Sequence, residues 1–185
     1  MKPNDTSLMT REIIDAYLEM ILGIMTLRIQ QVQDFLIPNF PEASVKSSYN
    51  HEDLIIDVVG LLNNFKNEGL KEVKSLQNSF RQVNKIFLLA MWDTLTSHKT
   101  YDGIANEPEI QFFRHIRNGC GHNNQLNFAA IEKPAKWRDK EITDSDKDKN
   151  VFPDMLRDGD PILLVMDINN KFFHPIDLTK KANIA

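Results

Sequence analysis

Apolar residues at helical spacing constrain the fold of this chain more than any other feature of its sequence. Over most of the first 128 residues, apolar side chains recur every three or four positions. At that spacing they share one face of an α-helix, and such a face is stable only when it is buried against another element. We therefore expect a mainly α fold in which four or more helices pack as a bundle.

The pattern predicts helices over residues 11–36, 50–66 and 70–98, and a shorter helix that begins near Asn106. Pro38 and Pro41 are expected to end the first helix, because proline lacks the N–H that a helix interior needs. Asn106 is a candidate N-cap, since its side chain can accept a hydrogen bond from a free backbone N–H of the first turn.

The sequence changes character after Phe128, where short apolar runs alternate with turn residues. Residues 151–152 and 162–166 are predicted strands, and residues 142–150 and 157–161 are predicted loops or turns. We therefore expect residues 1–129 to form the helical bundle and residues 130–185 to form a small β-rich appendage packed on it.

Composition and charge exclude several classes of protein. The net charge is −4, so any contact with nucleic acid has to be a local basic patch on an acidic body. Cys120 is the only cysteine of the sequence, which excludes an internal disulfide and a cysteine-cluster zinc site. Neither a secretory signal nor a run of about 20 apolar residues is seen. We expect a cytoplasmic protein without a membrane segment.

Residues 109–128 contain the side chains best suited to binding or catalysis. On a helix, one side carries the apolar residues Phe112, Phe113, Ile116 and Cys120. The opposite side carries the polar or small residues Arg114, Arg117, Asn118, Gly121 and His122. Each glycine costs about 1 kcal/mol relative to alanine in a helix. The helix therefore either continues to His122, with a glycine needed for a close approach, or ends at Gly119.

The polar side of this segment suits the cleavage of RNA without a metal ion. Arginine presents a planar fork of donors that matches phosphate oxygens, and histidine can transfer a proton near neutral pH. A neighbouring amide can orient a hydroxyl group or the imidazole. A base of this kind can deprotonate the ribose 2′-OH, which then attacks the adjacent phosphorus, whereas DNA lacks the attacking hydroxyl.

The stretch Arg117-Asn118-Gly119-Cys120-Gly121-His122 resembles the motif of the HEPN superfamily. In that motif an arginine, often followed by a polar residue, precedes a histidine by a short spacer on a late helix of a small helical bundle. The resemblance covers roughly residues 10–128 and leaves the C-terminal segment unexplained.

This resemblance implies a metal-independent endoribonuclease with no cofactor. It makes Arg117 and His122 the catalytic pair and Asn118 their polar partner. It also implies RNA as the substrate, a homodimer with a composite active site, and a toxin–antitoxin or phage-defence setting in which an antitoxin protein is a possible partner. Arg114 is not part of the motif, but it lies one turn before Asn118 on the same side, where it would help to hold the RNA backbone.

Two other functions remain open at this point. The chain would be a catalytically inactive HEPN module that binds nucleic acid, a nucleotide or a protein, or a helical bundle used only for protein interaction. In those cases Arg117 would pair with a surface carboxylate such as Glu109 or Glu132. His122 would then do no more than interact with the C-terminal end of the helix dipole.

Three further patterns are better explained by structure than by chemistry. The basic residues around Trp137 can hold a phosphate backbone and stack a base, but a strand with Trp137 in the core is favoured. The acids of residues 144–148 lack the glycine and glutamate of a calcium loop. Cys120 and His122 point apart on a helix, which disfavours a nucleophile pair.

Overall fold

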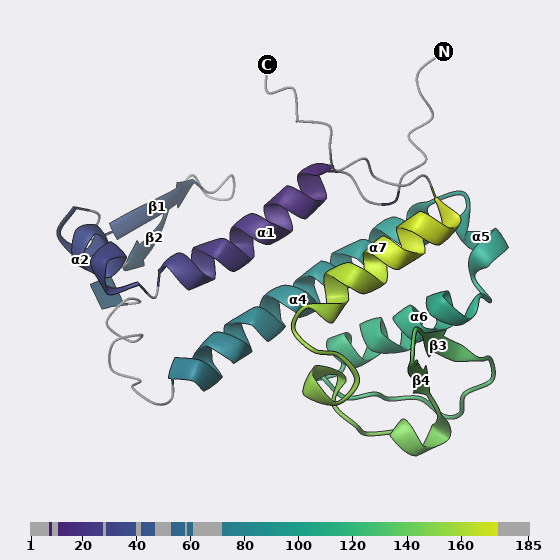
Figure 1. Cartoon of the computed structure of the whole chain (residues 1–185). Coiled ribbons are helices and arrows are strands. Elements are labelled where there is room, and N and C mark those ends of the chain that lie inside the picture. The colour runs from purple at the N-terminus through teal and green to yellow at the C-terminus, as the bar shows by residue number, and fades with distance from the viewer. Residues whose placement is uncertain are drawn as a thin grey trace, which may run out of the picture. The chain divides into compact units, whose positions relative to one another are not determined.

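The computed structural model describes residues 8, 11–27, 29–39, 42–46, 53–57, 59–60 and 72–173. These residues are mainly helical (Figure 1), which confirms the expected fold class at that level. They form two compact units. One unit contains the described residues up to Leu18 and from Arg81 onward, and the other contains those from Glu19 to Phe80. The predicted boundary between residues 129 and 130 lies inside the first of these units.

The predicted helix over residues 11–36 is two helices, α1 (Arg11–Thr26) and α2 (Gln30–Asn39). The Gln33 side chain donates a hydrogen bond of 2.9 Å to the carbonyl of Leu27, which lies in the break between the helices. This bond satisfies an acceptor that the interrupted helix leaves free. Pro38 lies in the last turn of α2 instead of ending the helix before it.

The prediction of a helix over residues 50–66 is wrong for residues 53–57, which form a strand. Strands β1 (Glu42–Lys46) and β2 (Asp53–Asp57) form an antiparallel pair, with Glu42 opposite Asp57. A short apolar run such as Leu54 to Ile56 fits a helix and a strand equally well, and the pairing partner decides between them. Except for residues 59–60, the remainder of the predicted helix lies outside the described residues.

The unit that carries the predicted site is built on α6 (Pro108–Gly121) and on the part of α4 (Glu72–Ser97) from Arg81 onward, with the short α5 (Tyr101–Ile104) between the two helices. The predicted third and fourth helices are thus confirmed over the described residues. Glu107, not Asn106, occupies the N-cap position of α6, and Pro108 follows at a first-turn position that tolerates proline. Trp92 of α4 packs edge-on against Phe113 of α6, with ring centroids 5.3 Å apart.

The segment after α6 contributes a hairpin, formed by β3 (Ala135–Trp137) and β4 (Lys140–Ile142), which packs on α6. Trp137 is 2% exposed, and its ring lies against Phe112, with centroids 5.9 Å apart. The expected strand with a buried tryptophan is therefore confirmed.

The predicted strand over residues 162–166 is wrong, because these residues belong to helix α7 (Asp160–Phe172). Its buried residues include Leu164, Val165 and Ile168, whose spacing is helical, and Pro161 lies in its first turn. The predicted strand at residues 151–152 is also wrong: it lies in the single turn η3 (Val151–Met155). Within residues 130–173, the β-structure is limited to the hairpin and one isolated bridge residue, Asn150.

Buried hydrogen bonds tie the elements of this unit together. The Tyr17 hydroxyl of α1 donates to the Asn84 side-chain oxygen of α4 at 2.7 Å. The Asn84 amide in turn donates to the carbonyl of Asp158, just before α7, at 2.9 Å. Asn84 is fully buried, so these bonds fix α1, α4 and the start of α7 relative to one another.

Candidate functional site

Helix α6 carries all four residues that the sequence analysis selected. It runs to Gly121, and His122 is its C-cap, with a backbone N–H that donates to the carbonyls of Asn118 and Gly119 at 3.0 and 3.1 Å. The helix therefore continues past Gly119, as one of the two open interpretations expected. Arg117, Asn118 and His122 lie on its last turns, and Arg114 lies one turn earlier.

One of the two glycines is explained by close packing. A Cβ atom on Gly119 would lie 2.5 Å from Cγ2 of Val151 and 3.2 Å from the carbonyl oxygen of Gln125. A Cβ atom on Gly121 would meet no atom within 4 Å. Gly119 thus lets the segment around Val151 approach the helix, whereas Gly121 faces open space.

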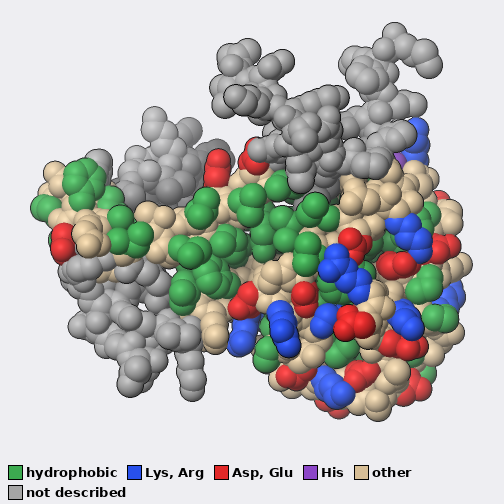
Figure 2. Space-filling view, in the orientation of Figure 1, with side chains coloured by type: hydrophobic (Ala, Val, Ile, Leu, Met, Phe, Trp, Pro, Cys, Tyr) green, Lys and Arg blue, Asp and Glu red, His purple; other side chains and the backbone are tan. Residues whose placement is uncertain are grey.

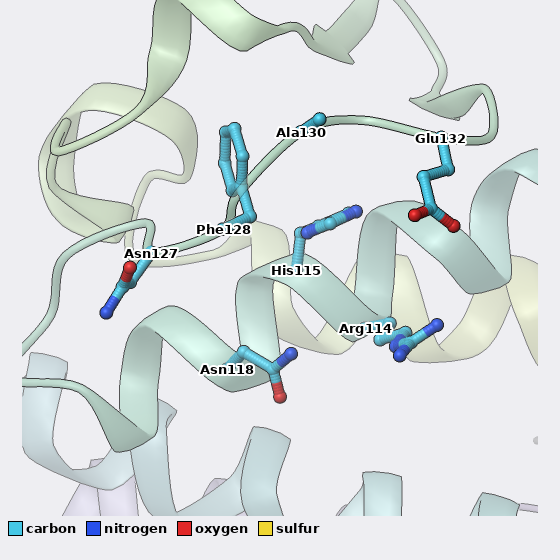
Figure 3. A pocket seen from close by; sticks show the side chains of 7 residues that line it. All are labelled: Arg114, His115, Asn118, Asn127, Phe128, Ala130 and Glu132. Atoms are coloured by element: carbon cyan, nitrogen blue, oxygen red, sulfur yellow. The ribbon is translucent and has the colours of Figure 1, made fainter.

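A polar cavity of about 280 Å³ lies over one side of α6. Its wall is formed by side chains of the helix and of the loop that passes over it (Figure 3). The lining residues are Arg114, His115, Asn118, Asn127, Phe128, Ala130 and Glu132. Two of the four predicted residues, Arg114 and Asn118, therefore meet at this cavity, and Arg117 and His122 do not line it.

The cavity wall holds charged and aromatic groups close together. His115 is half-buried, and its ring lies edge-on to Phe128 with centroids 5.2 Å apart. Burial lowers the pKa of His115 below its ordinary value of 6.5, and the nearby Arg114 guanidinium lowers this pKa further. The imidazole is therefore neutral at physiological pH and available to accept a hydrogen bond or a proton.

Arg117 points away from the cavity, toward α4. Its Nη2 atom lies 3.7 Å from Oδ1 of Asp93. The partner is therefore Asp93, and not Glu109 or Glu132, which the sequence analysis had suggested. The Asp93 side chain is 72% exposed, and an ion pair of this kind contributes about 0–1 kcal/mol. The Nε atom of Arg117 is buried without an acceptor among the described residues. Arg117 is thus held only weakly where it lies.

His122 is exposed at the end of α6. In the described part of the chain, no hydrogen bond or ion pair joins its imidazole to Arg117 or to another side chain. The motif histidine and the motif arginine therefore share no hydrogen bond in this structure.

The remaining candidates have structural roles. Burial raises the pKa of the Cys120 thiol to about 12, so it is no nucleophile. Arg138 forms a two-pronged pair with Asp167, at 2.7 and 3.2 Å, and the buried indole of Trp137 donates to the same carboxylate. Trp137 therefore cannot stack a base. Asp146 accepts hydrogen bonds from Thr143 and Lys149 within its own turn, as a loop residue would.

The described residues contain neither a metal-binding cluster nor a helix that could span a membrane. No three His, Cys, Asp or Glu side chains there gather into a group that could hold a metal ion. None of the helices described is both long enough and apolar enough to cross a bilayer. On the face in Figure 2, Lys and Arg side chains are interspersed with Asp and Glu, so a basic contact surface there has to be small.

No family model matches the chain, and neither does a curated protein or a solved structure. The resemblance to the HEPN superfamily therefore depends on the motif of α6 alone.

Sequence reasoning did not place His115, Phe128 and Glu132 at the candidate site, and it named Glu132 only as a possible partner of Arg117. His115 precedes Asn118 by three positions, which places the two on one side of a helix, so the spacing alone already indicated it. Phe128 and Glu132 come from the loop after the helix, and their sequence positions carry no comparable signal.

Proposed function

We propose that this chain is a metal-independent endoribonuclease of the HEPN type that cleaves RNA through the ribose 2′-OH. The observation that supports this most is the end of α6, where Arg114 and Asn118 line a polar cavity and an exposed His122 caps the helix, while Arg117 is held only by a weak pair with Asp93. Phosphate binding and proton transfer require these groups within one short surface.

The proposed reaction starts at His122. Its imidazole accepts the proton of the 2′-OH, and the 2′-oxygen attacks the adjacent phosphorus. The bond from phosphorus to the 5′-oxygen breaks, and this oxygen leaves with a proton, so that the products end in a 2′,3′-cyclic phosphate and a 5′-OH. Arg117 stabilises the negative charge that develops on the phosphate, because its exposed pair with Asp93 is weak enough to be exchanged. Asn118 orients the reacting groups, and Arg114 binds the substrate.

A homodimer belongs to this proposal. An in-line displacement requires a base and an acid on opposite sides of the phosphorus, and α6 presents one exposed histidine at this surface. A second copy of the chain would supply the other proton-transferring group. An antitoxin protein as partner, a role in phage defence and a cytoplasmic location are parts of the same proposal.

The test is cleavage of single-stranded RNA in the presence of EDTA by the parent protein and by His122→Ala and Arg117→Ala. We expect each substitution to lower the rate by about 100-fold or more. Arg157→Ala is the control, because Arg157 is exposed and lies outside α6. A DNA strand of the same sequence should remain intact. Equal rates for parent and variants, or products with 3′-OH and 5′-phosphate ends, would contradict the proposal.

A second candidate function is a non-catalytic module that binds RNA or a nucleotide. It is favoured by the position of Arg117, which already pairs with Asp93. RNA that is retarded in a gel-shift assay but stays intact would support this function, and cleavage by the parent alone would exclude it.

A further inference from the structure

The cavity over α6 contains two opposite charges that do not neutralise each other. Arg114 and Glu132 both line it, but no ion pair joins them, and neither pairs with another side chain in the part of the chain described. Figure 3 shows Arg114 projecting from α6 and Glu132 from the loop opposite. A ligand that presents acceptors at one edge and donors at the next would satisfy both charges at once.

The other groups of the wall favour a flat ligand. Phe128 and His115 form an edge-to-face pair, and the face of an aromatic ring is where single-stranded bases stack. The amides of Asn118 and Asn127 add donors and acceptors. The volume, about 280 Å³, is slightly below the range of roughly 300–1,000 Å³ that is typical of small-ligand sites. The cavity therefore suits one base and not a longer segment.

We propose that this cavity recognises one guanine base of single-stranded RNA, next to the bond that is cleaved. The Arg114 guanidinium would donate to O6 and N7 of the base, and the Glu132 carboxylate would accept from N1–H and the N2 amino group. The Phe128 ring would stack on the base. The position next to the cleaved bond rests on the proposed function, whereas the recognition of the base does not.

Guanine fits these two charges better than the alternatives. Adenine would set its N6 donor against the Arg114 donors and has neither an N1–H nor an N2 amino group for Glu132, and the pyrimidines have no N7. A phosphate group would be repelled by the Glu132 carboxylate in the same wall.

The direct test is calorimetric titration of the full chain with GMP, AMP, CMP, UMP, guanosine and inorganic phosphate, together with NMR signals of the His115 ring. We expect GMP and guanosine to bind with similar affinity, at least about 10-fold more tightly than the other nucleotides. Both should shift the His115 signals. Binding of UMP as tight as that of GMP, binding of inorganic phosphate alone, or no binding of GMP would overturn the proposal.

Matched substitutions locate the binding to the cavity. Arg114→Gln and Glu132→Gln should each weaken GMP binding by about 10-fold, and Phe128→Leu should weaken it by about 5-fold or more. Arg157→Gln and Glu141→Gln are the controls, because both side chains are exposed and lie outside the cavity. Circular dichroism verifies the fold of each variant. Equal losses in variants and controls would overturn the assignment to this cavity.

The same proteins separate this inference from the proposed nuclease activity. GMP binding that depends on Glu132, in a protein that cleaves no RNA, would support the guanine site and contradict the nuclease. Cleavage of RNA with and without guanine at equal rates would contradict the position of the guanine site next to the cleaved bond and leave the nuclease intact. His122→Ala should retain GMP binding while cleavage is lost.

Discussion

At the scale of single residues, His115 is the cavity residue whose pKa is shifted by its surroundings. Its pKa is lowered by burial and, to a smaller extent, by Arg114. Arg114→Gln should therefore raise the pKa of His115 toward 6.5, and Arg157→Gln should leave it unchanged. NMR titration of the ring protons measures both values. An unchanged pKa in Arg114→Gln would show that the two side chains do not interact.

The lowered pKa also sets the pH dependence of stability. The neutral imidazole is favoured in the folded state, so the contribution of His115 is fully present above pH 6.5 and is lost as the pH falls through the lower folded-state pKa. Denaturant unfolding of the parent and His115→Gln should be compared at roughly pH 7 and pH 5, on either side of the ordinary histidine value. The difference in stability between the two proteins should be smaller at the acidic pH.

The sequence predicted part of the candidate site at this scale. Arg114 and Asn118 were placed on one side of a helix by their spacing, and both line the cavity. The pairing of Arg117 with Asp93 joins two helices that are separate in sequence, and local spacing contains no information about it. The same is true of Glu132, which reaches the cavity from a loop.

At the scale of secondary-structure elements, Gly119 and Gly121 provide a matched pair of substitutions in one helix. Gly119→Ala places a methyl group against Val151 and the backbone of Gln125, and should destabilise the protein by about 1–3 kcal/mol. Gly121→Ala places it in open space, and should stabilise the protein by about 0.4–1 kcal/mol. Urea unfolding of both variants measures the difference. Equal effects at the two positions would mean that Val151 does not pack tightly against α6.

Elements were predictable from the sequence where the amphipathic pattern is long. Helices α4 and α6 extend over 26 and 14 residues, enough turns for a helical period to be distinct from alternation. The runs at residues 54–56 and 162–166 are too short for that, and each was assigned the wrong type. The first depends on pairing with β1, and the second on the helix start at Asp160-Pro161. A single run of apolar residues carries neither piece of information.

At the scale of the whole molecule, two buried groups should make stability fall at alkaline pH. The pKa values of Tyr17 and Cys120 are both raised to about 12, in each case mainly by burial. A raised pKa means that the neutral form stabilises the fold below the ordinary values of 10.0 and 9.0. This contribution is lost as the pH rises toward about 12. The urea concentration at the midpoint of unfolding should therefore decrease as the pH rises from roughly 8 to 11, an interval that contains the ordinary pKa values of both groups.

Tyr17→Phe is the variant that checks the cause of this decrease. At neutral pH it removes the hydrogen bond to Asn84 and should cost about 1 kcal/mol. Its midpoint should then depend less on pH than that of the parent, because one of the two titrating groups is absent. A pH dependence identical to that of the parent would exclude Tyr17 as a source.

Helix α6 has one side sealed in the interior, where Ile110, Phe112, Phe113 and Ile116 are fully buried, and the other side facing the loop that contains Glu132. Mutations on the buried side of the helix disturb the hydrophobic core and are poorly tolerated, while an exposed loop accepts replacements freely. Changes of ligand preference during evolution should therefore accumulate in residues 127–132, and the buried side of the helix should stay nearly constant beneath them.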